Sequence, residues 1–465
     1  MTENKEKEKT MQYFLAIDIG ASSGRHILGW LEEGVLKTEE IYRFSNQPIE
    51  KNGSLYWDSK RLFQEIVNGL KRAKEMGKTP ISVGVDTWGV DYVLLDAKDE
   101  PLREIYCYRD ERTNAQFEKV HDKIPFEKLY QKTGIQFAPF NTVYQLSDDQ
   151  EKGLLDKAET FLMLPDYFHF LLTGVKKQEY TNATTTGMVD ASTHTWCHEI
   201  IQTLGYKSSL FQPLSQPSSL VGELKEEIVK QVGYCAKVVL PATHDTASAV
   251  LSAPIENGQP YISSGTWSLL GVEQPFAHTD LFACHSGYSN EGSVYGNFRL
   301  QKNIMGLWII QQVRHELKDT YSFAELANLA KQNPIQTEFD VNDARFFAPK
   351  SMLTEIYGAV GKKLTVGQTA YAVFDNLAKS YAQSLRELEK LTGQSYDTLH
   401  IIGGGSKNSF LNELTKQKTG KRIITGPTEG TAIGNLIMQT VGAGICPNVQ
   451  AGREIVKKSF EIKEV

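Results

Sequence analysis

The sequence has little cysteine and no long apolar segment. Five cysteines are scattered among its 465 residues, and no two of them form a CxxC pair. An odd, dispersed set of this kind indicates a reducing compartment, so we expect a cytoplasmic protein. No apolar run approaches the roughly 18 residues of a transmembrane helix, so we predict no membrane partner.

The sequence also lacks a basic excess. Its formal net charge is -6, and 23% of its residues are charged. Binding to a nucleic-acid backbone requires a basic surface, so we predict no nucleic-acid partner. The charged segment at residues 1–10 is expected to be a disordered tail and not a secretory signal, because the apolar run after it is short and contains Asp18.

Two familiar nucleotide motifs are absent. The run Gly358-Ala-Val-Gly-Lys-Lys363 has the wrong spacing for a Walker A motif and lacks its Ser or Thr. At Gly403-Gly-Gly405, Asn408 stands where a dinucleotide fingerprint needs its third glycine. Any ATP site in this chain must therefore work without a P-loop.

Two turns of similar composition are present instead, one in each half of the chain. The first is Asp18-Ile-Gly-Ala-Ser-Ser-Gly-Arg25, and the second lies within Tyr261-Ile-Ser-Ser-Gly-Thr-Trp-Ser268. Each follows an apolar strand and exposes backbone N–H groups beside hydroxyl side chains, which suits a phosphate chain. Either turn alone could be an ordinary hairpin. Together they favour a cleft that holds phosphate from both sides, with Asp18 available to a hydrated magnesium ion.

The order of predicted elements indicates an α/β fold. Strands at 12–19, 26–31 and 34–44 form a meander, a helix begins after Asp58, and strands follow at 81–86 and 91–96. This β-β-β-α-β order differs from a Rossmann domain and is typical of a ribonuclease-H-like core, the unit of actin-like ATPases. We predict two such domains flanking a central cleft, at residues 11–252 and 259–465, with a linker at 253–258.

The second half is expected to repeat this plan in a diverged form. A strand at 260–264 is followed by helices around 304–318 and 367–391 and by a strand at 399–402. The three glycines after that strand would let an adenine ring lie flat against the backbone.

Asp245 is the candidate general base. It follows a predicted strand at 237–240 and precedes a helix of small residues. An Asp at this place is often only a helix cap, but it can also accept the proton of an attacking hydroxyl in a cleft. Trp88 is by default a core residue, and a sugar-facing wall is the alternative.

These segments resemble the FGGY family of carbohydrate kinases from residue 14 to about residue 440. The two turns carry part of the resemblance. The other segments that carry it are Gly84-Val-Asp-Thr-Trp-Gly-Val-Asp91, Gly134-Ile-Gln-Phe-Ala-Pro-Phe-Asn-Thr142, Leu164-Pro-Asp-Tyr-Phe168, Glu179-Tyr-Thr-Asn-Ala-Thr-Thr-Thr186, His244-Asp-Thr-Ala-Ser-Ala249, Lys302-Asn-Ile-Met-Gly-Leu-Trp308 and Ile402-Gly-Gly-Gly405. The resemblance implies an enzyme that transfers phosphate from ATP, with Mg2+, to the 1-hydroxyl of L-rhamnulose in L-rhamnose catabolism. The cysteine pairs of some relatives have no counterpart here, so no disulfide is predicted.

The resemblance also implies roles for individual residues. Asp245 would be the proton acceptor, and Asp18 would position the metal through water. The residues expected to bind ATP are Ala21, Ser22, Ser23, Gly24, Arg25, Thr266, Gln311 and Gly404. The residues expected to bind the sugar are Gly89, His244, Asp245, Thr246 and Asn303.

Two alternatives remain at this stage. The substrate could be another ketose or polyol, such as L-fuculose, L-xylulose or glycerol. The chain could also be a non-sugar ATPase on the actin-like fold, which would need the phosphate turns but no sugar-facing base. Whether the protein is a monomer or a homodimer stays open, as does the preference for the nucleotide base.

Overall fold

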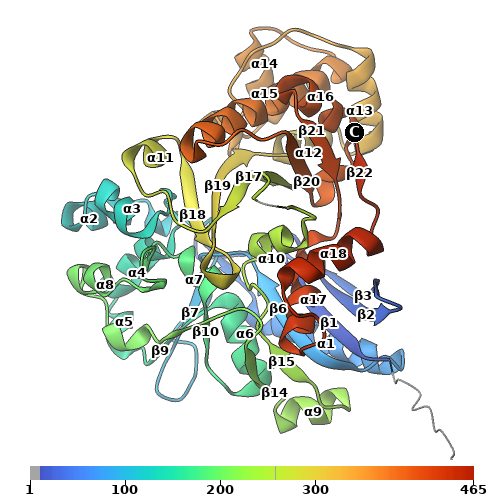
Figure 1. Cartoon of the computed structure of the whole chain (residues 1–465). Coiled ribbons are helices and arrows are strands. Elements are labelled where there is room, and N and C mark those ends of the chain that lie inside the picture. Colours follow the sequence, from blue (N-terminus) through green and yellow to red (C-terminus); the bar gives the residue numbers. More distant parts are fainter. Residues whose placement is uncertain (1–10, 257) are drawn as a thin grey trace, which may run out of the picture.

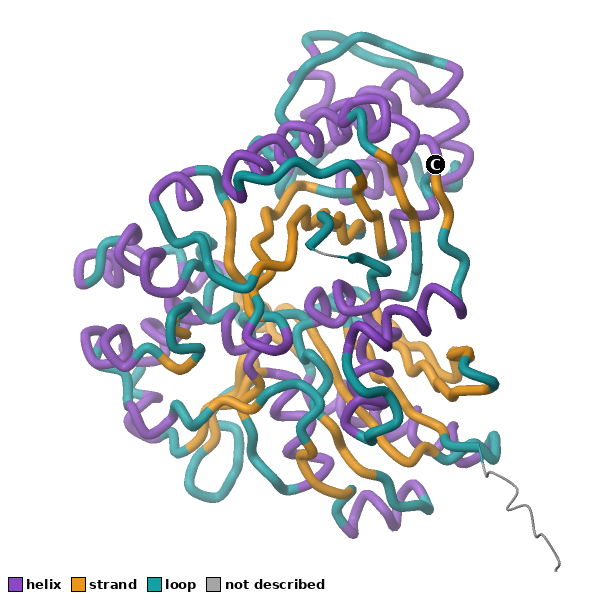
Figure 2. The backbone as a smooth tube through the Cα atoms, in the orientation of Figure 1, coloured by secondary structure: helices purple, strands orange, loops and turns teal. Residues whose placement is uncertain are grey.

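Two mixed β-sheets, one from each half of the chain, form the framework of the protein (Figure 1). The computed structural model describes residues 11–256 and 258–465, so the tail predicted for residues 1–10 lies outside the described residues. In Figure 2 the strands of the two sheets lie at different levels of the molecule, with helices around and between them.

The first sheet has six strands. In order across the sheet they are β14 (Leu220–Glu223), β15 (Lys237–Val239), β6 (Pro80–Thr87), β1 (Tyr13–Ile19), β2 (Ser23–Glu32) and β3 (Val35–Ser45). The predicted meander is confirmed, because β1, β2 and β3 pair antiparallel, and β6 and β15 run parallel to β1.

The second sheet has seven strands. In order they are β18 (Tyr288–Gly292), β19 (Phe298–Met305), β17 (Trp267–Gln274), β16 (Tyr261–Ser264), β20 (Thr398–Ile402), β21 (Arg422–Thr425) and β22 (Lys463–Glu464). Here β16, β17 and β19 form an antiparallel meander, and β20 and β21 run parallel to β16. The five central strands therefore repeat the order of the first sheet, as predicted for two ribonuclease-H-like units.

The remaining strands are short. They are β4 (Ile49–Lys51), β5 (Ser54–Trp57), β7 (Tyr92–Leu95), β8 (Ile105–Tyr106), β9 (Thr160–Met163), β10 (Gln178–Glu179), β11 (Val189–Asp190), β12 (Thr195–Trp196) and β13 (Leu214–Ser215). The strand predicted at 91–96 corresponds to β7, but it pairs with β9 in a separate two-stranded sheet and does not extend the first sheet.

Helices cover both sheets and build the middle of the chain. They are α1 (Ser59–Glu75), α2 (Gln116–Lys123), α3 (Phe126–Thr133), α4 (Thr142–Glu151), α5 (Leu154–Lys157), α6 (Leu164–Thr173), α7 (Tyr180–Thr184), α8 (His198–Leu204), α9 (Glu226–Val232), α10 (Asp245–Ser252), α11 (Leu281–His285), α12 (Trp308–Glu316), α13 (Phe323–Gln332), α14 (Met352–Val360), α15 (Val366–Thr392), α16 (Ser409–Thr419), α17 (Gly430–Gly442) and α18 (Val449–Ser459). None of the helices in the described part of the chain has both the length and the apolar character needed to span a bilayer.

Helix α1 illustrates how the sequence builds the first half. Asp58 caps it by accepting a hydrogen bond of 3.0 Å from the backbone N–H of Arg61. Leu62, Ile66 and Leu70 recur at helical spacing and are fully buried against the first sheet. Each buried side chain of this kind contributes about 1.5–3 kcal/mol to folding, so the amphipathic pattern is what fixes the helix on the sheet.

The start predicted near residue 304 for the helix around 304–318 is wrong. Strand β19 continues to Met305, and α12 begins only at Trp308. All eight residues of β19 pair with β17, and Gly306 follows where an added Cβ would lie 2.6 Å from the backbone of Trp267. Sheet pairing therefore overrides the local sequence pattern up to this glycine.

One helix of the C-terminal half lies on the first sheet. In Figure 1, α17 is coloured red but packs beside the blue strands β1 and β6. Its Ala432 and Leu436 are buried with Phe14, Ala16 and Ile27. The two halves thus share a hydrophobic core at this helix. The domain bounds of 11–252 and 259–465 stay a prediction, and the packing of α17 crosses them.

Candidate active site

A cavity of about 1250 Å³ lies between the two halves. It is lined by both predicted turns, by the start of α10, and by residues of β19 and α12. The predicted site residues that line it are Asp18, Ala21, Ser22, Ser23, Arg25, Gly89, His244, Asp245, Thr246, Thr266, Asn303, Gln311 and Gly404. Residues far apart in the sequence therefore meet in one place, with a volume above that of a typical small-molecule pocket.

Gly24 is the one predicted site residue that does not line this cavity. It is a buried residue of β2, and an added Cβ would lie 2.1 Å from the ring of Phe44. Because Gly24 has no side chain, the ring of Phe44 can pack against its backbone in the core of the N-terminal half. The expectation that Gly24 takes part in phosphate binding is therefore not supported by its position.

The first turn is tightly closed by its own backbone and by Asn46. The N–H of Gly20 donates to the carbonyl of Ser23 at 2.9 Å, and the N–H of Asn46 donates to the carbonyl of Ser22 at 2.9 Å. The side-chain amide of Asn46 also donates to the carbonyl of Gly20 at 2.9 Å. Ala21, Ser22 and Ser23 are thus held at the cavity wall.

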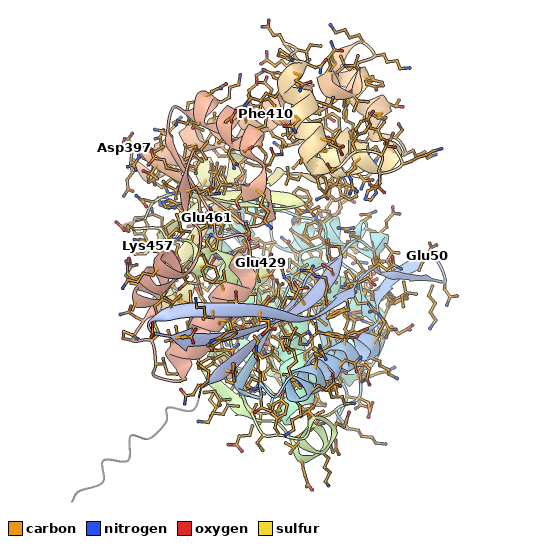
Figure 3. All side chains as sticks on the ribbon, turned by 90° about the vertical axis from the view of Figure 1, so that its right-hand side faces the viewer. Glu50, Asp397, Phe410, Glu429, Lys457 and Glu461 are labelled. Carbon is orange, nitrogen blue, oxygen red and sulfur yellow. The ribbon has the colours of Figure 1, made fainter. Side chains whose placement is uncertain are left out.

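Charged side chains stand directly behind this turn. Asp18 and Arg25 face each other across β1 and β2, and the Nε and Nη2 atoms of Arg25 lie 2.9 and 2.8 Å from Oδ2 of Asp18. Arg25 also pairs with Glu429, which comes from the other half of the chain. Figure 3 labels Glu429 where the red C-terminal helices meet the blue N-terminal strands.

The second turn is neutral by comparison. The N–H of Gly265 donates to the carbonyl of Trp267 at 2.9 Å, which closes the turn and leaves Thr266 at the cavity wall. Glycines 403 and 405 pack against this turn, because an added Cβ would lie 2.9 Å from the carbonyl of Ser264 or 2.0 Å from its hydroxyl. Gly403 and Gly404 both line the cavity, and an added Cβ would meet nothing within 4 Å only at Gly404, so the glycine surface expected for an adenine ring stays a prediction.

Asp245 is the first residue of α10 and not its N-cap, which is His244. Its Oδ1 accepts hydrogen bonds from the backbone N–H of Thr246 at 2.6 Å and from the hydroxyl of Thr246 at 3.2 Å. Its side chain is 29% exposed and lines the cavity. Burial raises the pKa of Asp245, and the charge of Asp18 adds to the rise while His244 and Thr246 oppose it. A carboxylate with a raised pKa in a cleft is suited to accept a proton.

The loop before Asp245 is anchored by a buried carboxylate. Glu179 accepts hydrogen bonds at Oε2 from the backbone N–H and the hydroxyl of Thr243, at 3.2 and 2.6 Å. The side-chain amide of Asn182 donates to the carbonyl of Thr243 at 3.3 Å. The backbone that carries His244 and Asp245 is therefore fixed from α7, as an active-site loop needs to be.

Trp88 is a core residue at the cavity wall, and its role as a sugar-facing wall stays a prediction. Its side chain is buried, and its Nε1 donates to Asp91 at 2.8 Å, yet the residue also lines the cavity beside Gly89. Asp91 receives a second indole donor, from Trp57 at 2.7 Å. Burial raises the pKa of Asp91 to about 6, although these donors oppose the rise. The aromatic wall is thus held by a buried carboxylate.

Asp86 is a buried carboxyl group next to Asp18 that sequence reasoning did not select. It lies opposite Asp18 in the parallel register of β1 and β6, and it is fully buried. Its Oδ2 accepts a hydrogen bond of 2.5 Å from Asn435 of α17, whereas its Oδ1 has no partner within the described residues. Burial and the neighbouring Asp18 raise the pKa of Asp86 well above its usual range.

The amide residues of α17 were also missed. Asn435 donates to the carbonyl of Gly84 at 3.1 Å, and Gln439 donates to the carbonyl of Leu15 at 2.9 Å. Their spacing is the one sequence signal that could have identified them, because two amides four residues apart in a mostly apolar helix lie on one face. Nothing in the sequence indicates that this face meets the first sheet.

The carboxyl groups of Asp18 and Asp86 are the candidate ligands for a metal ion near the first turn. Among residues 11–256 and 258–465, no group of three or more His, Cys, Asp or Glu side chains is arranged to hold a metal ion. Magnesium is commonly held by one or two carboxylates together with water and substrate phosphates. Asp18 at the cavity wall, with the unpartnered Oδ1 of Asp86 behind it, fits that mode of binding and not a closed protein cage.

Comparison with protein families gives two matches that together span most of the chain. Residues 13–252 match the N-terminal domain and residues 260–443 match the C-terminal domain of the FGGY family of carbohydrate kinases.

Similar proteins are found along the whole length. The chain is 46% identical over 461 residues to a rhamnulokinase of Halalkalibacterium halodurans, covering 97% of this chain and 98% of the relative. It is 42% identical over 458 residues to a rhamnulokinase of Bacillus subtilis, covering 97% and 94%.

Solved structures show the same fold at low sequence identity. A gluconate kinase from Lactobacillus acidophilus superposes with a TM-score of 0.80 at 17% identity, covering 98% of this chain and 93% of the other. A Plasmodium falciparum glycerol kinase with ADP superposes with a TM-score of 0.76 at 15% identity, covering 97% and 94%.

Proposed function

Because the chain belongs to the FGGY family of carbohydrate kinases, we propose that it transfers the γ-phosphoryl group of ATP to the 1-hydroxyl of L-rhamnulose. The product is L-rhamnulose 1-phosphate, formed in L-rhamnose catabolism. The observation that carries this proposal is the identity of 46%, over nearly the whole of both chains, to a protein named rhamnulokinase. The cavity supports it, because Asp245 and both glycine- and hydroxyl-rich turns line the same space.

Asp245 is the proton acceptor in this proposal. The 1-hydroxyl of the sugar gives its proton to the Asp245 carboxylate as the hydroxyl oxygen forms a bond to the γ-phosphorus. The bond between this phosphorus and the β,γ-bridging oxygen breaks, and ADP leaves. General-base assistance of this kind typically accelerates a reaction by about 10²–10⁴-fold, and positioning supplies much of the rest.

The two turns hold the ATP phosphates from opposite sides. Backbone N–H groups and hydroxyls of residues 21–23 and of Thr266 face the phosphate oxygens, and the guanidinium of Arg25 adds a positive charge. Gln311 and Gly404 lie nearer the nucleoside. The open space above Gly404 supports this assignment, since a nucleoside needs a surface that no side chain covers.

The metal in this proposal is Mg2+. Bound magnesium would neutralise charge that develops on the phosphates during transfer. Asp18 would hold it through water, and Arg25, with Nη2 at 2.8 Å from Oδ2 of Asp18, would orient this carboxylate.

The sugar lies on the side of the cavity that is formed by α10, β19 and the aromatic wall. Gly89, His244, Thr246 and Asn303 contact its hydroxyl groups in this proposal, and all four line the cavity. The protein acts in the cytoplasm, which is supported by the free state of all five cysteines. Its partners are ATP and the ketose.

A panel of acceptors tests the substrate. The purified protein is incubated with MgATP and, separately, L-rhamnulose, L-fuculose, L-xylulose or glycerol, and ADP is detected by a coupled assay. We expect kcat/KM for L-rhamnulose to exceed that for the others by at least about tenfold, as for sites that hydrogen-bond a specific set of hydroxyls. Robust turnover of another acceptor, with none of L-rhamnulose, would overturn the proposal.

A further inference from the structure

The ring of His244 lies between two carboxylates from different halves of the chain. Its Nε2 is 3.4 Å from Oδ1 of Asp245, and its Nδ1 is 3.1 Å from Oε2 of Glu291 on β18. Arg299 on β19 completes the group, with Nη2 at 2.9 Å from the same oxygen of Glu291 and at 3.2 Å from Nδ1 of His244. The Arg299 side chain is fully buried, and the other three are mostly buried.

The donors and acceptors of this group restrict the protons on the ring. A guanidinium donates and cannot accept. In a neutral ring protonated at Nε2, Nδ1 accepts from Arg299 and Nε2–H faces Oδ1 of Asp245 at 3.4 Å. In a doubly protonated ring, Nδ1–H donates to Glu291 and Nε2–H again faces Asp245. A neutral ring protonated at Nδ1 would turn the Nε2 lone pair toward the Asp245 carboxylate without a donor to stabilise it. In the ring protonated at Nε2, the Nδ1 lone pair also lies near a carboxylate, that of Glu291 at 3.1 Å, but it accepts a hydrogen bond from Arg299 that offsets this approach.

Glu291 and Arg299 are themselves firmly held. Nε of Arg299 donates to the carbonyl of Gly292 at 3.2 Å, so the guanidinium cannot rotate away without losing this bond. Burial would raise the pKa of Glu291, but the charges of Arg299 and His244 outweigh burial and lower it to about 2. Glu291 is therefore a fixed anion beside His244.

We propose that Glu291 and Arg299 are positioning residues for phosphoryl transfer, which act by fixing His244 with its Nε2–H directed at Asp245. The inference rests on the proposed function of Asp245 as the base. Oδ1 of Asp245 then accepts from Thr246 and faces His244, and Oδ2, which has no hydrogen bond to any described residue, is the oxygen that takes the substrate proton. Because Glu291 and Arg299 come from the second half, the arrangement of the base depends on contact between the halves.

The first test is kinetic and uses a matched pair of double variants. Glu291→Gln/Arg299→Met removes both charges together, so that neither is left buried without its partner. The control, Glu273→Gln/Arg453→Met, removes another mostly buried pair, joined at 2.5 Å, whose residues do not line the cavity. The acceptor is whichever ketose the unmodified protein phosphorylates fastest.

We expect the Glu291/Arg299 variant to lose roughly ten- to a hundredfold in kcat, since small misplacement of a reacting group costs this much. Its KM for ATP should change by less than about threefold, because ATP contacts are intact. The control should keep kcat within about threefold. Equal losses in both variants, or full activity of the Glu291/Arg299 variant, would overturn the proposal.

The second test reads the ring directly in the unmodified protein and uses a variant only to assign the signal. Among the ten histidines of the ¹⁵N-histidine-labelled protein, His244 is assigned by the signal that is missing in His244→Asn. Its ¹⁵N shifts should show a protonated Nε2, and an Nδ1–H tautomer would overturn the proposal. This readout is independent of the substrate, so failure of the acceptor panel and failure of this inference are distinguishable.

Discussion

The two turns occupy equivalent places in the two sheets but differ in charge. Counted back from the last strand pair of each hairpin, Asp18 and Arg25 of the first sheet correspond to Ser263 and Leu269 of the second. On the neighbouring parallel strand, Asp86 corresponds to Ile402. The same backbone plan therefore carries ionisable groups in one half and neutral or apolar groups in the other.

This difference indicates a division of work between the halves. Both turns offer backbone N–H groups to phosphate, but only the first has carboxylates that can serve a metal, and Asp245 lies on the same side. The second turn lines the cavity together with Gly404 and Gln311, the residues that we propose lie near the nucleoside. We infer that the first half performs the chemistry and the second half holds the nucleotide, and the predictions below test this difference.

Between the two turns, the larger effect is expected from Asp18→Asn in the first. Loss of a carboxylate that positions a metal through water should lower kcat about 10- to 100-fold, with partial recovery at high Mg2+. The measurement is kcat against Mg2+ concentration. Glu429→Gln is the control, because it removes the other carboxylate partner of Arg25 but no proposed metal contact. Equal losses in the two variants would mean that Asp18 acts only through Arg25.

A smaller effect is expected in the second turn from Thr266→Val. A hydrogen bond to a charged phosphate contributes about 1.5–3 kcal/mol, so KM for ATP should rise by about tenfold or more while kcat changes little. Asn303→Ala, on the sugar side of the same cavity, should raise KM for the ketose and not for ATP. If the two variants give the same pattern of KM changes, the separation of nucleotide and sugar sides is wrong.

The smallest effect concerns stability and pH. His26 of β2 is fully buried where the second sheet has Leu270, and burial lowers the pKa of His26 to about 3. The unfolded chain, with an ordinary histidine pKa near 6.5, therefore binds a proton first as pH falls. The stabilising contribution of neutral His26 is complete above about pH 6.5 and is lost as pH falls toward 3.

His26→Gln removes this dependence. The difference in free energy of unfolding between the unmodified protein and the variant should change by about 2 kcal/mol between pH 6.5 and 5, in favour of the variant at low pH. Urea unfolding at the two pH values measures it, and His285→Gln, at an exposed histidine, is the control. A pH-independent difference for His26→Gln would contradict the pKa of His26.

Much of the fold on which this comparison rests could be predicted from the sequence, because the sequence patterns that indicate it lie within single segments. The hairpins, α1 with its Asp58 cap and α15 follow from residue patterns within one segment. Membership of the FGGY family, predicted from the motifs, is confirmed by both family models. Most of the predicted site residues are brought to one cavity, although their individual roles stay predictions.

The rest depends on contacts between distant segments. Asp86 has the same local pattern as a buried strand residue, and only the register with β1 brings it beside Asp18. Glu291 and Arg299 lie on an ordinary pair of strands, and their approach to His244 requires both halves to be in place. The packing of α17 on the first sheet has the same origin, since its partners lie more than 340 residues away in the chain.

The central claim is that phosphoryl transfer depends on Asp245 in the first half and that binding of ATP does not depend on Asp245. Asp245→Asn is nearly isosteric and tests this directly, with kcat and the calorimetric Kd for MgATP measured on the same preparation. We expect kcat to fall by about 10³-fold while Kd changes by less than about threefold, because the general base is lost and the phosphate turns are intact. Full kinase activity in this variant would contradict the account.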